Sequence, residues 1–366
     1  QSSHRNALTG KGLVFDPIVP GFSSAISSSS GFSAPTGVAT GDFNNDGFAD
    51  AAFIESSNAT INIVLGNGDG TLSPGTAILL PGGSNLISIT ANIFRTGSSN
   101  TDLAVADSTS GEIFVFLGNG DGTFTASTPA SFTAGIGASS EITSGNIEGS
   151  MSLFAAQIDA GVALGGRAMF LGNGDGTFDS ATPVTLSNPS GVFKIGGGDI
   201  DNDGDFDLGT VHLATVSSLI HTYLGDGAGV FSPTATPTSI TGGGVINGFI
   251  FSDFDNDDNL DLAVIGENPG EVSIFPGDGT GVFSSGDAAP AAVPGSNASA
   301  IDSADFNNDE MDDLIVTDSV TGNAYVLLNP PLPSITNVTS STANGSYRAG
   351  DTISIQITFD HTVAVT

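Results

Sequence analysis

The chain has 366 residues, 39% of them hydrophobic, and its 39 acidic and six basic residues give a formal net charge of −33. This apolar content is enough for a folded core, whereas so acidic a surface excludes nucleic acid as a partner. The absence of Cys excludes disulfides and thiolate chemistry, and 51 Gly and 17 Pro with only 12% charged residues favour an all-β fold.

Residues 1–12 are predicted to be a leader ahead of the folded region. They have no initial Met and no apolar h-region, and no run of 18 apolar residues occurs in the chain, so we expect no direct membrane insertion. The following segment, GLVFDPIVPG at 12–21, resembles the strands GTFTASTPA and GVFSPTATP found later. Because the last repeat stops at LLNPPLPS without such a strand, we expect this N-terminal strand to complete it.

An internal repeat organises the chain from residue 13 to about residue 330. Four segments superimpose without gaps: GDFNNDGFADAAF (41–53), GDIDNDGDFDLGT (198–210), SDFDNDDNLDLAV (252–264) and ADFNNDEMDDLIV (304–316). Weaker copies at 91–107 and 145–157 fall in phase, so that the second residues lie at 42, 92, 146, 199, 253 and 305. This regularity predicts six structural units.

A glycine-rich turn follows the acidic segment in five of the six units. The turns read LGNGDGTL (65–72), LGNGDGTF (117–124 and 171–178), LGDGAGVF (224–231) and PGDGTGVF (276–283). Glycine supplies the positive φ of a hairpin, and the flanking runs are strand-like. One unit is therefore strand, acidic loop, strand, short turn, strand, glycine turn and strand, which is one blade of a β-propeller. We interpret the NGDG segments as turns, since calcium-binding nonapeptides recur far more closely.

This pattern resembles the FG-GAP/VCBS repeat family, whose best-known members form the N-terminal propeller of integrin α chains. The resemblance covers residues 13–330 and implies a calcium-binding, extracellular propeller. Propellers of this family often have seven blades, so a seven-bladed ring is the alternative to the six-bladed β-propeller that the repeat count predicts.

The acidic loops are the predicted metal sites. Calcium takes six to eight oxygen ligands, and each loop offers side-chain oxygens at positions 1, 3, 5 and 9 and a backbone carbonyl at position 7. The predicted ligands in the four loops are Asp42, Asn44, Asp46, Phe48 and Asp50; Asp199, Asp201, Asp203, Asp205 and Asp207; Asp253, Asp255, Asp257, Asn259 and Asp261; and Asp305, Asn307, Asp309, Met311 and Asp313.

About four Ca²⁺ ions are expected, because carboxylates this close together repel each other strongly without a cation. Position 6 is Gly47 or Gly204 in two loops, but Asp258 and Glu310 replace it in the others and are expected to strain the turn. An EF-hand is the competing calcium motif, yet it requires Glu at position 12, where this chain has Phe, Thr or Val.

Units two and three have lost the predicted site. In unit two, Arg95 is expected to stand in for the ion beside the remaining acid, Asp102. Unit three keeps only Glu148. We therefore expect no metal in either blade.

No catalytic residue is predicted, and the chain is expected not to be an enzyme. The four His residues share no metal-ligand spacing, and no nucleophile elbow, phosphate loop or dinucleotide fingerprint occurs. The alternative is a calcium-dependent polysaccharide lyase or hydrolase, for which the repeats supply few basic residues or Tyr residues.

Residues 331–366 are predicted to be a linker followed by incomplete Ig-like strands. The segment TISIQITF alternates apolar and polar residues, and the region resembles the opening strands of the bacterial Ig-like domains found in tandem on surface proteins. Tandem Ig-like domains in the full-length chain would follow from that resemblance. About 33 residues are too few for a whole β-sandwich, which needs roughly 100.

The leading functional hypothesis is a calcium-binding adhesion module at the surface of a bacterial cell or in a secreted protein. Its ligand would be an extracellular protein or a glycan, with protein slightly favoured because the chain has no Trp and only 3 Tyr. A structural spacer or subunit of a surface assembly is the second hypothesis.

Overall fold

The computed structural model describes residues 22, 26–28, 32–80, 84–133, 140–157, 167–184, 186, 192–213, 218–234, 237–240, 246–266, 270–284, 291–294, 297–331, 335–340, 342, 348, 351 and 354–359. They divide between two compact units, one of residues 20–330 and one of residues 1–19 with 331–366. Strands are the regular elements of the described residues, and no helix among them is long and apolar enough to cross a membrane.

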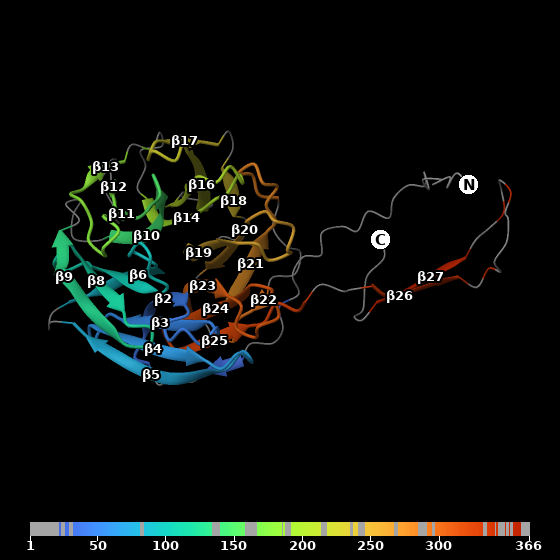
Figure 1. Cartoon of the computed structure of the whole chain (residues 1–366), viewed down its shortest axis with the longest axis horizontal. Coiled ribbons are helices and arrows are strands. Elements are labelled where there is room, and N and C mark those ends of the chain that lie inside the picture. The colour runs from blue at the N-terminus through green and yellow to red at the C-terminus, as the bar shows by residue number, and fades with distance from the viewer. Residues whose placement is uncertain are drawn as a thin grey trace. The chain divides into compact units, whose positions relative to one another are not determined.

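The larger unit is a six-bladed β-propeller, which confirms the predicted fold and settles the blade number (Figure 1). Each blade is an antiparallel sheet in which consecutive strands lie side by side. Blades 1 to 3 consist of β2 (Pro35–Gly41), β3 (Asp50–Glu55), β4 (Thr60–Gly66) and β5 (Leu72–Leu79); β6 (Leu86–Asn92), β7 (Asp102–Asp107), β8 (Glu112–Gly118) and β9 (Phe124–Thr133); and β10 (Ser140–Ile147), β11 (Ser150–Gln157), β12 (Arg167–Phe170) and β13 (Thr182–Pro183).

Blades 4 to 6 repeat the arrangement. They consist of β14 (Val192–Gly198), β15 (Asp207–Leu213), β16 (Ser218–Gly225) and β17 (Phe231–Pro233); β19 (Ile246–Ser252), β20 (Asp261–Gly266), β21 (Glu271–Phe275) and β22 (Ala291–Ala292); and β23 (Ala298–Ala304), β24 (Asp313–Asp318), β25 (Asn323–Leu327) and β1 (Ile26–Ser28). In blade 4 a further strand, β18 (Thr238–Ile240), also pairs with β16.

The ring closes through the N-terminus, as predicted. Strand β1 pairs antiparallel with β25, with Ile26 opposite Val326, so the first strand in the chain completes the last blade. The closing strand is 26–28 and not the segment 12–21 that was expected to supply it, which lies outside the described residues. Closure covers the outer edge of blade 6, which would otherwise present unpaired backbone groups.

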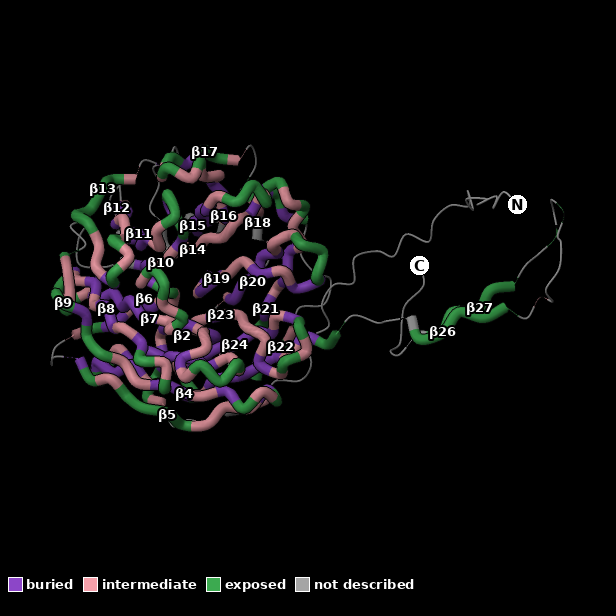
Figure 2. The backbone as a smooth tube through the Cα atoms, viewed as in Figure 1, coloured by how far each residue is buried: buried purple, intermediate pink, exposed green. Residues whose placement is uncertain are grey.

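The core lies between the blades (Figure 2). One apolar residue near the start of each acidic segment, such as Phe43, Phe94 or Phe306, is buried there. Phe43 packs edge to face against Phe124 of the next blade, with ring centroids 5.4 Å apart, and Phe94 meets Phe178 in the same way at 5.3 Å. The Phe that ends the sequence NGDGTF is therefore a contact between neighbouring blades.

The smaller unit contains a two-stranded antiparallel sheet of β26 (Ile335–Ser340) and β27 (Ile355–Phe359). Val338 and Ile355 are exposed on it. A single hairpin does not form the two-sheet core of an Ig-like domain, so the resemblance of this region to such domains stays a prediction.

Candidate metal sites

All four acidic loops and the glycine turns lie on one face of the propeller, because each acidic loop joins the first and second strands of a blade and each glycine turn joins the third and fourth. The two alternate around the ring. Gly122, in the turn of blade 2, donates its N–H to the carbonyl of Phe43 in the loop of blade 1, and Gly70 donates to Phe306, both at 2.9 Å. The NGDG segments are thus tight turns that tie each blade to the preceding loop.

The carboxylate at position 1 holds each loop in its curved shape. Asp42 Oδ1 accepts the N–H of Asp46 at 3.2 Å, and Oδ2 accepts that of Gly47 at 3.0 Å. The same pair of contacts recurs in the other three loops, where the acceptors are Asp199, Asp253 and Asp305.

The residue at position 7 is oriented by the acid at position 5. Phe48 donates its N–H to Asp46 Oδ1 at 2.9 Å, and the same bond recurs in the other three loops. The N–H of each position-7 residue is thereby used, while its carbonyl is the predicted ligand. The residues concerned are Phe48, Asp205, Asn259 and Met311.

The acid at position 9 anchors the loop to the blade. Asp50 is fully buried at the start of β3, and its two oxygens accept the N–H groups of Phe43 and Gly66, both at 2.8 Å. Asp207, Asp261 and Asp313 make the same pair of bonds. Spacing predicted these four residues as ligands but gave no sign of this second, structural role.

Burial makes the ionised form of these four anchors costly. Burial, assisted by the neighbouring loop acids and opposed by the backbone hydrogen bonds, raises the pKa of Asp50 and Asp207 to about 6 and the pKa of Asp261 and Asp313 to about 7. These values describe the metal-free protein, in which part of the population is protonated near neutral pH. A bound cation would favour the ionised form.

The acidic loops of blades 4 and 5 (loops four and five) each bring three carboxylates within ligand distance of one another. One oxygen from each of Asp199, Asp201 and Asp207 lies within 4.8 Å of the others, and Asp253, Asp255 and Asp261 form the equivalent group. In each group the position-3 acid has a buried oxygen, Oδ1 of Asp201 or Asp255, that no donor among the described residues reaches. Such an orphaned acceptor amid carboxylates fits a hard divalent cation.

Loops one and six differ because position 3 is Asn. Asn44 Nδ2 donates to Asp46 Oδ2 at 2.8 Å, and Asn307 Nδ2 donates to Asp309 Oδ2 at 3.0 Å. An internal hydrogen bond therefore occupies an oxygen of position 5 that was predicted as a ligand. Among the described residues, the two groups of three clustered carboxylates are those of loops four and five.

Position 6 requires a left-handed backbone in every loop. Gly47 and Gly204 have φ of 86° and 92°, and Asp258 and Glu310 adopt 69° at the same place. The expected strain at these two residues is therefore present. Position 4 also has positive φ, from 57° to 60°, and is Asn in all four loops, which is the residue that tolerates this conformation best after Gly.

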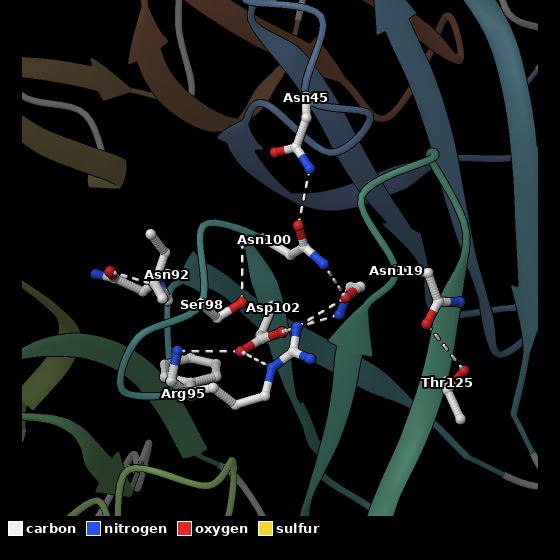
Figure 3. A network of polar contacts seen from close by, with 11 residues as sticks. Asn45, Asn92, Arg95, Ser98, Asn100, Asp102, Asn119 and Thr125 are labelled. Carbon is white, nitrogen blue, oxygen red and sulfur yellow. Dashed lines mark hydrogen bonds and ion pairs between the residues drawn. The ribbon is translucent and has the colours of Figure 1, made fainter.

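In blade 2 a basic side chain pairs with the acid at the start of the second strand, as predicted for Arg95 and Asp102 (Figure 3). Asp102 is buried and accepts the N–H groups of Phe94 and Gly118, as the anchors of the other blades do. Arg95 donates to both of its oxygens, from Nε at 3.2 Å and from a terminal nitrogen at 2.6 Å, and that nitrogen also reaches the carbonyl of Gly118 at 2.7 Å. In blade 3, Glu148 is exposed, so neither blade gathers acids.

Comparison with known proteins supports the repeat and the fold. Residues 253–316 match the model of the FG-GAP-like repeat family. No curated protein matches the sequence. Among solved structures, the high-resolution structure of Penicillium chrysogenum alpha-L-arabinanase complexed with arabinobiose is similar, with a TM-score of 0.60 and 11% identity over 85% of this chain and 99% of that chain.

The likeness to the arabinanase corrects one expectation. The chain was expected not to be an enzyme because its conspicuous acids belong to the loops and no catalytic motif occurs. A similar structure is that of an enzyme, so this fold is no argument against catalysis. At 11% identity the likeness shows the fold, and it assigns no residue a catalytic role.

Proposed function

We propose that this propeller with an FG-GAP-like repeat binds calcium in its acidic loops and acts as an extracellular binding module of a bacterial surface or secreted protein. The observation that carries the proposal is the buried, unpartnered Oδ1 of Asp201 and of Asp255, each beside two further carboxylates. An ionised oxygen without a donor is costly in a folded protein, and a cation removes that cost.

The choice of calcium rests on the ligands and on the setting. The loops offer carboxylate, amide and carbonyl oxygens and no nitrogen or sulfur ligand, which is the set that Ca²⁺ prefers. Extracellular calcium modules work at dissociation constants of about 10⁻⁴–10⁻³ M. A surface of net charge −33 also becomes less self-repelling when it takes up divalent ions.

The binding role follows from the arrangement of the loops. Acidic loops and glycine turns together form one face of the ring, and calcium would fix their shape for an extracellular protein or glycan. A rigid spacer in a surface assembly would use the same calcium but no specific ligand. Pull-down and glycan-array binding with the calcium-loaded protein separates these two roles.

A carbohydrate-cleaving activity is a second candidate. It is favoured by the fold likeness to alpha-L-arabinanase, which covers nearly the whole of that enzyme. Release of reducing sugar from polysaccharides, arabinan among them, is the assay for this candidate.

The calcium proposal is tested by thermal melting with and without metal. Calcium at about 100 times its dissociation constant adds about 2.7 kcal/mol per site, which for several sites raises the melting temperature by several degrees. Asp201→Asn should stabilise the metal-free protein, because burial and the nearby charge of Asp203 raise the pKa of the Asp201 carboxyl and make its ionised form costly. The same change should reduce the gain from calcium, since it removes a charged ligand.

Glu148→Gln is the matched control, because Glu148 occupies position 3 of the blade that lacks a site. It should leave the calcium-dependent gain unchanged. Equal melting of the wild-type protein in calcium and in chelator would contradict the proposal.

A further inference from the structure

A cavity lies on the axis of the propeller. Its volume is about 290 Å³, and all six innermost strands, β2, β6, β10, β14, β19 and β23, contribute to its wall. Ligand pockets usually measure about 300–1,000 Å³, so this one is sized for a small molecule or for the end of a longer one.

The wall of this axial cavity is polar because of the architecture. Each innermost strand is an edge of its sheet, so a row of its backbone N–H and C=O groups faces the axis without a strand partner. Side chains of the neighbouring blade form hydrogen bonds with some of these backbone groups. Ile142 donates its N–H to Ser88 Oγ at 3.1 Å, and Asn247 Nδ2 donates to the carbonyl of Ala298 at 2.7 Å.

Hydroxyl groups add to the lining. The Oγ atoms of Thr90 and Ser144 lie 3.0 Å apart across the junction of blades 2 and 3, and Asn92 Nδ2 donates to Ser144 Oγ at 3.2 Å. Groups of this kind both donate and accept hydrogen bonds, as the hydroxyls of a sugar do.

The charges of the cavity select against anions. Among the residues that line it, Lys194 is the basic one, and it is paired with Glu141. Asp302 accepts the N–H of Thr40 at 2.8 Å, its hydroxyl at 3.1 Å and the N–H of Ser303 at 3.0 Å. Anions meet a net negative wall, since the carboxylates of Glu141 and Asp302 face the one ammonium group of Lys194.

We propose that the axial cavity binds a neutral saccharide, with Asp302 accepting a hydrogen bond from a sugar hydroxyl. This inference names a site and a ligand class for the proposed binding role, on which it rests, and it uses no residue of the acidic loops. The chain has no Trp that could form an exposed aromatic platform for a sugar. Recognition by hydroxyl and amide groups inside a cavity does not need such a platform.

The test is calorimetric titration of the calcium-loaded protein with maltose, cellobiose, xylobiose and arabinobiose, and with digalacturonate as an anionic control. At least one neutral disaccharide should bind and digalacturonate should not. Asp302→Asn should weaken binding about tenfold or more, since it removes a hydrogen bond to a charged group. The double variant Thr90→Val/Ser144→Ala should weaken binding about threefold or more, since it removes two neutral hydroxyl groups. Asp351→Asn, the same change at an exposed residue of the smaller unit, should have no effect.

Three results would overturn the inference: no binding of any neutral disaccharide at about 10 mM, unchanged binding in both cavity variants, or tighter binding of digalacturonate. Calcium-dependent melting of each variant shows that it is folded. If the saccharide inference fails, calcium still raises the melting temperature. If the calcium proposal fails, calcium does not raise the melting temperature, and the saccharide titration is interpreted on its own.

Discussion

At the scale of the residue, Arg95 gives Asp102 the positive charge that a bound metal ion would give to Asp50. Asp102 is 0% exposed, as is Asp50, and each accepts two backbone N–H groups that link the loop to the third strand of the blade. Such an anchor must be ionised to accept both bonds fully, and ionisation in the interior requires a nearby positive charge. Arg95 supplies that charge permanently, so we expect blade 2 not to depend on calcium.

Arg95→Met should therefore destabilise the protein by about 1–3 kcal/mol, because it leaves a buried carboxylate without its charged donor. Denaturant unfolding measures the change, and the loss should be the same with calcium and with chelator. The double variant Arg95→Met/Asp102→Asn should recover part of it. A loss that calcium reverses would mean that the loop of blade 2 binds metal after all.

At the scale of the element, each acidic loop has a residue with a left-handed backbone conformation at position 6. Glu310 has a φ of 69° there, which costs a side chain on the order of 1 kcal/mol. Glu310→Gly should stabilise its loop by a similar amount. Gly204→Ala should destabilise its own loop by a similar amount, although a Cβ at Gly204 would meet no atom within 4 Å, so that the backbone is the cause.

Both changes are measured by calcium titration and thermal melting. We expect tighter calcium binding for Glu310→Gly and weaker binding for Gly204→Ala. Opposite shifts would show that the carboxylate of Glu310 matters more to the ion than the conformation of the backbone.

The repeat made the blades predictable, since the period fixes where each acidic loop and glycine turn begins. The loop contacts between blades were not predictable, because the carbonyl of Phe43 and the N–H of Gly122 carry no side-chain signature. Sequence reasoning also missed Asp302. The alignment of the repeats held a signal for it, since the position three residues before the loop is acidic in unit six and Ala39, Ile89, Thr143, Gly196 or Ile250 in the others.

The acids give the whole molecule a pH dependence that calcium should reverse. In the metal-free protein the pKa values of the anchors and of Asp302 rise to about 6 or 7, from an unfolded value of 3.8. Between about pH 4 and pH 7 the folded state therefore holds more protons than the unfolded state. The free energy of unfolding must then fall as the pH rises through this window.

Denaturant unfolding of metal-stripped protein at pH 5 and pH 7.5 should accordingly show lower stability at pH 7.5. Calcium should raise the stability at pH 7.5 more than at pH 5, because protons compete with the ion for the same oxygens. If the metal-free protein were more stable at pH 7.5 than at pH 5, ionisation of the four anchor acids would not lower the free energy of unfolding, and the prediction would be wrong.

The central claim is that divalent cations balance the clustered carboxylates of the propeller. Equilibrium dialysis against about 10 mM calcium, which exceeds the dissociation constants expected of extracellular sites, with elemental analysis of the protein and buffer sides, tests it most directly. The account predicts about four Ca²⁺ ions per chain, with those of loops four and five lost in Asp201→Ala and Asp255→Ala variants, which leave no oxygen ligand at position 3. Fewer than about one ion per chain, or a content that these variants do not change, would contradict it.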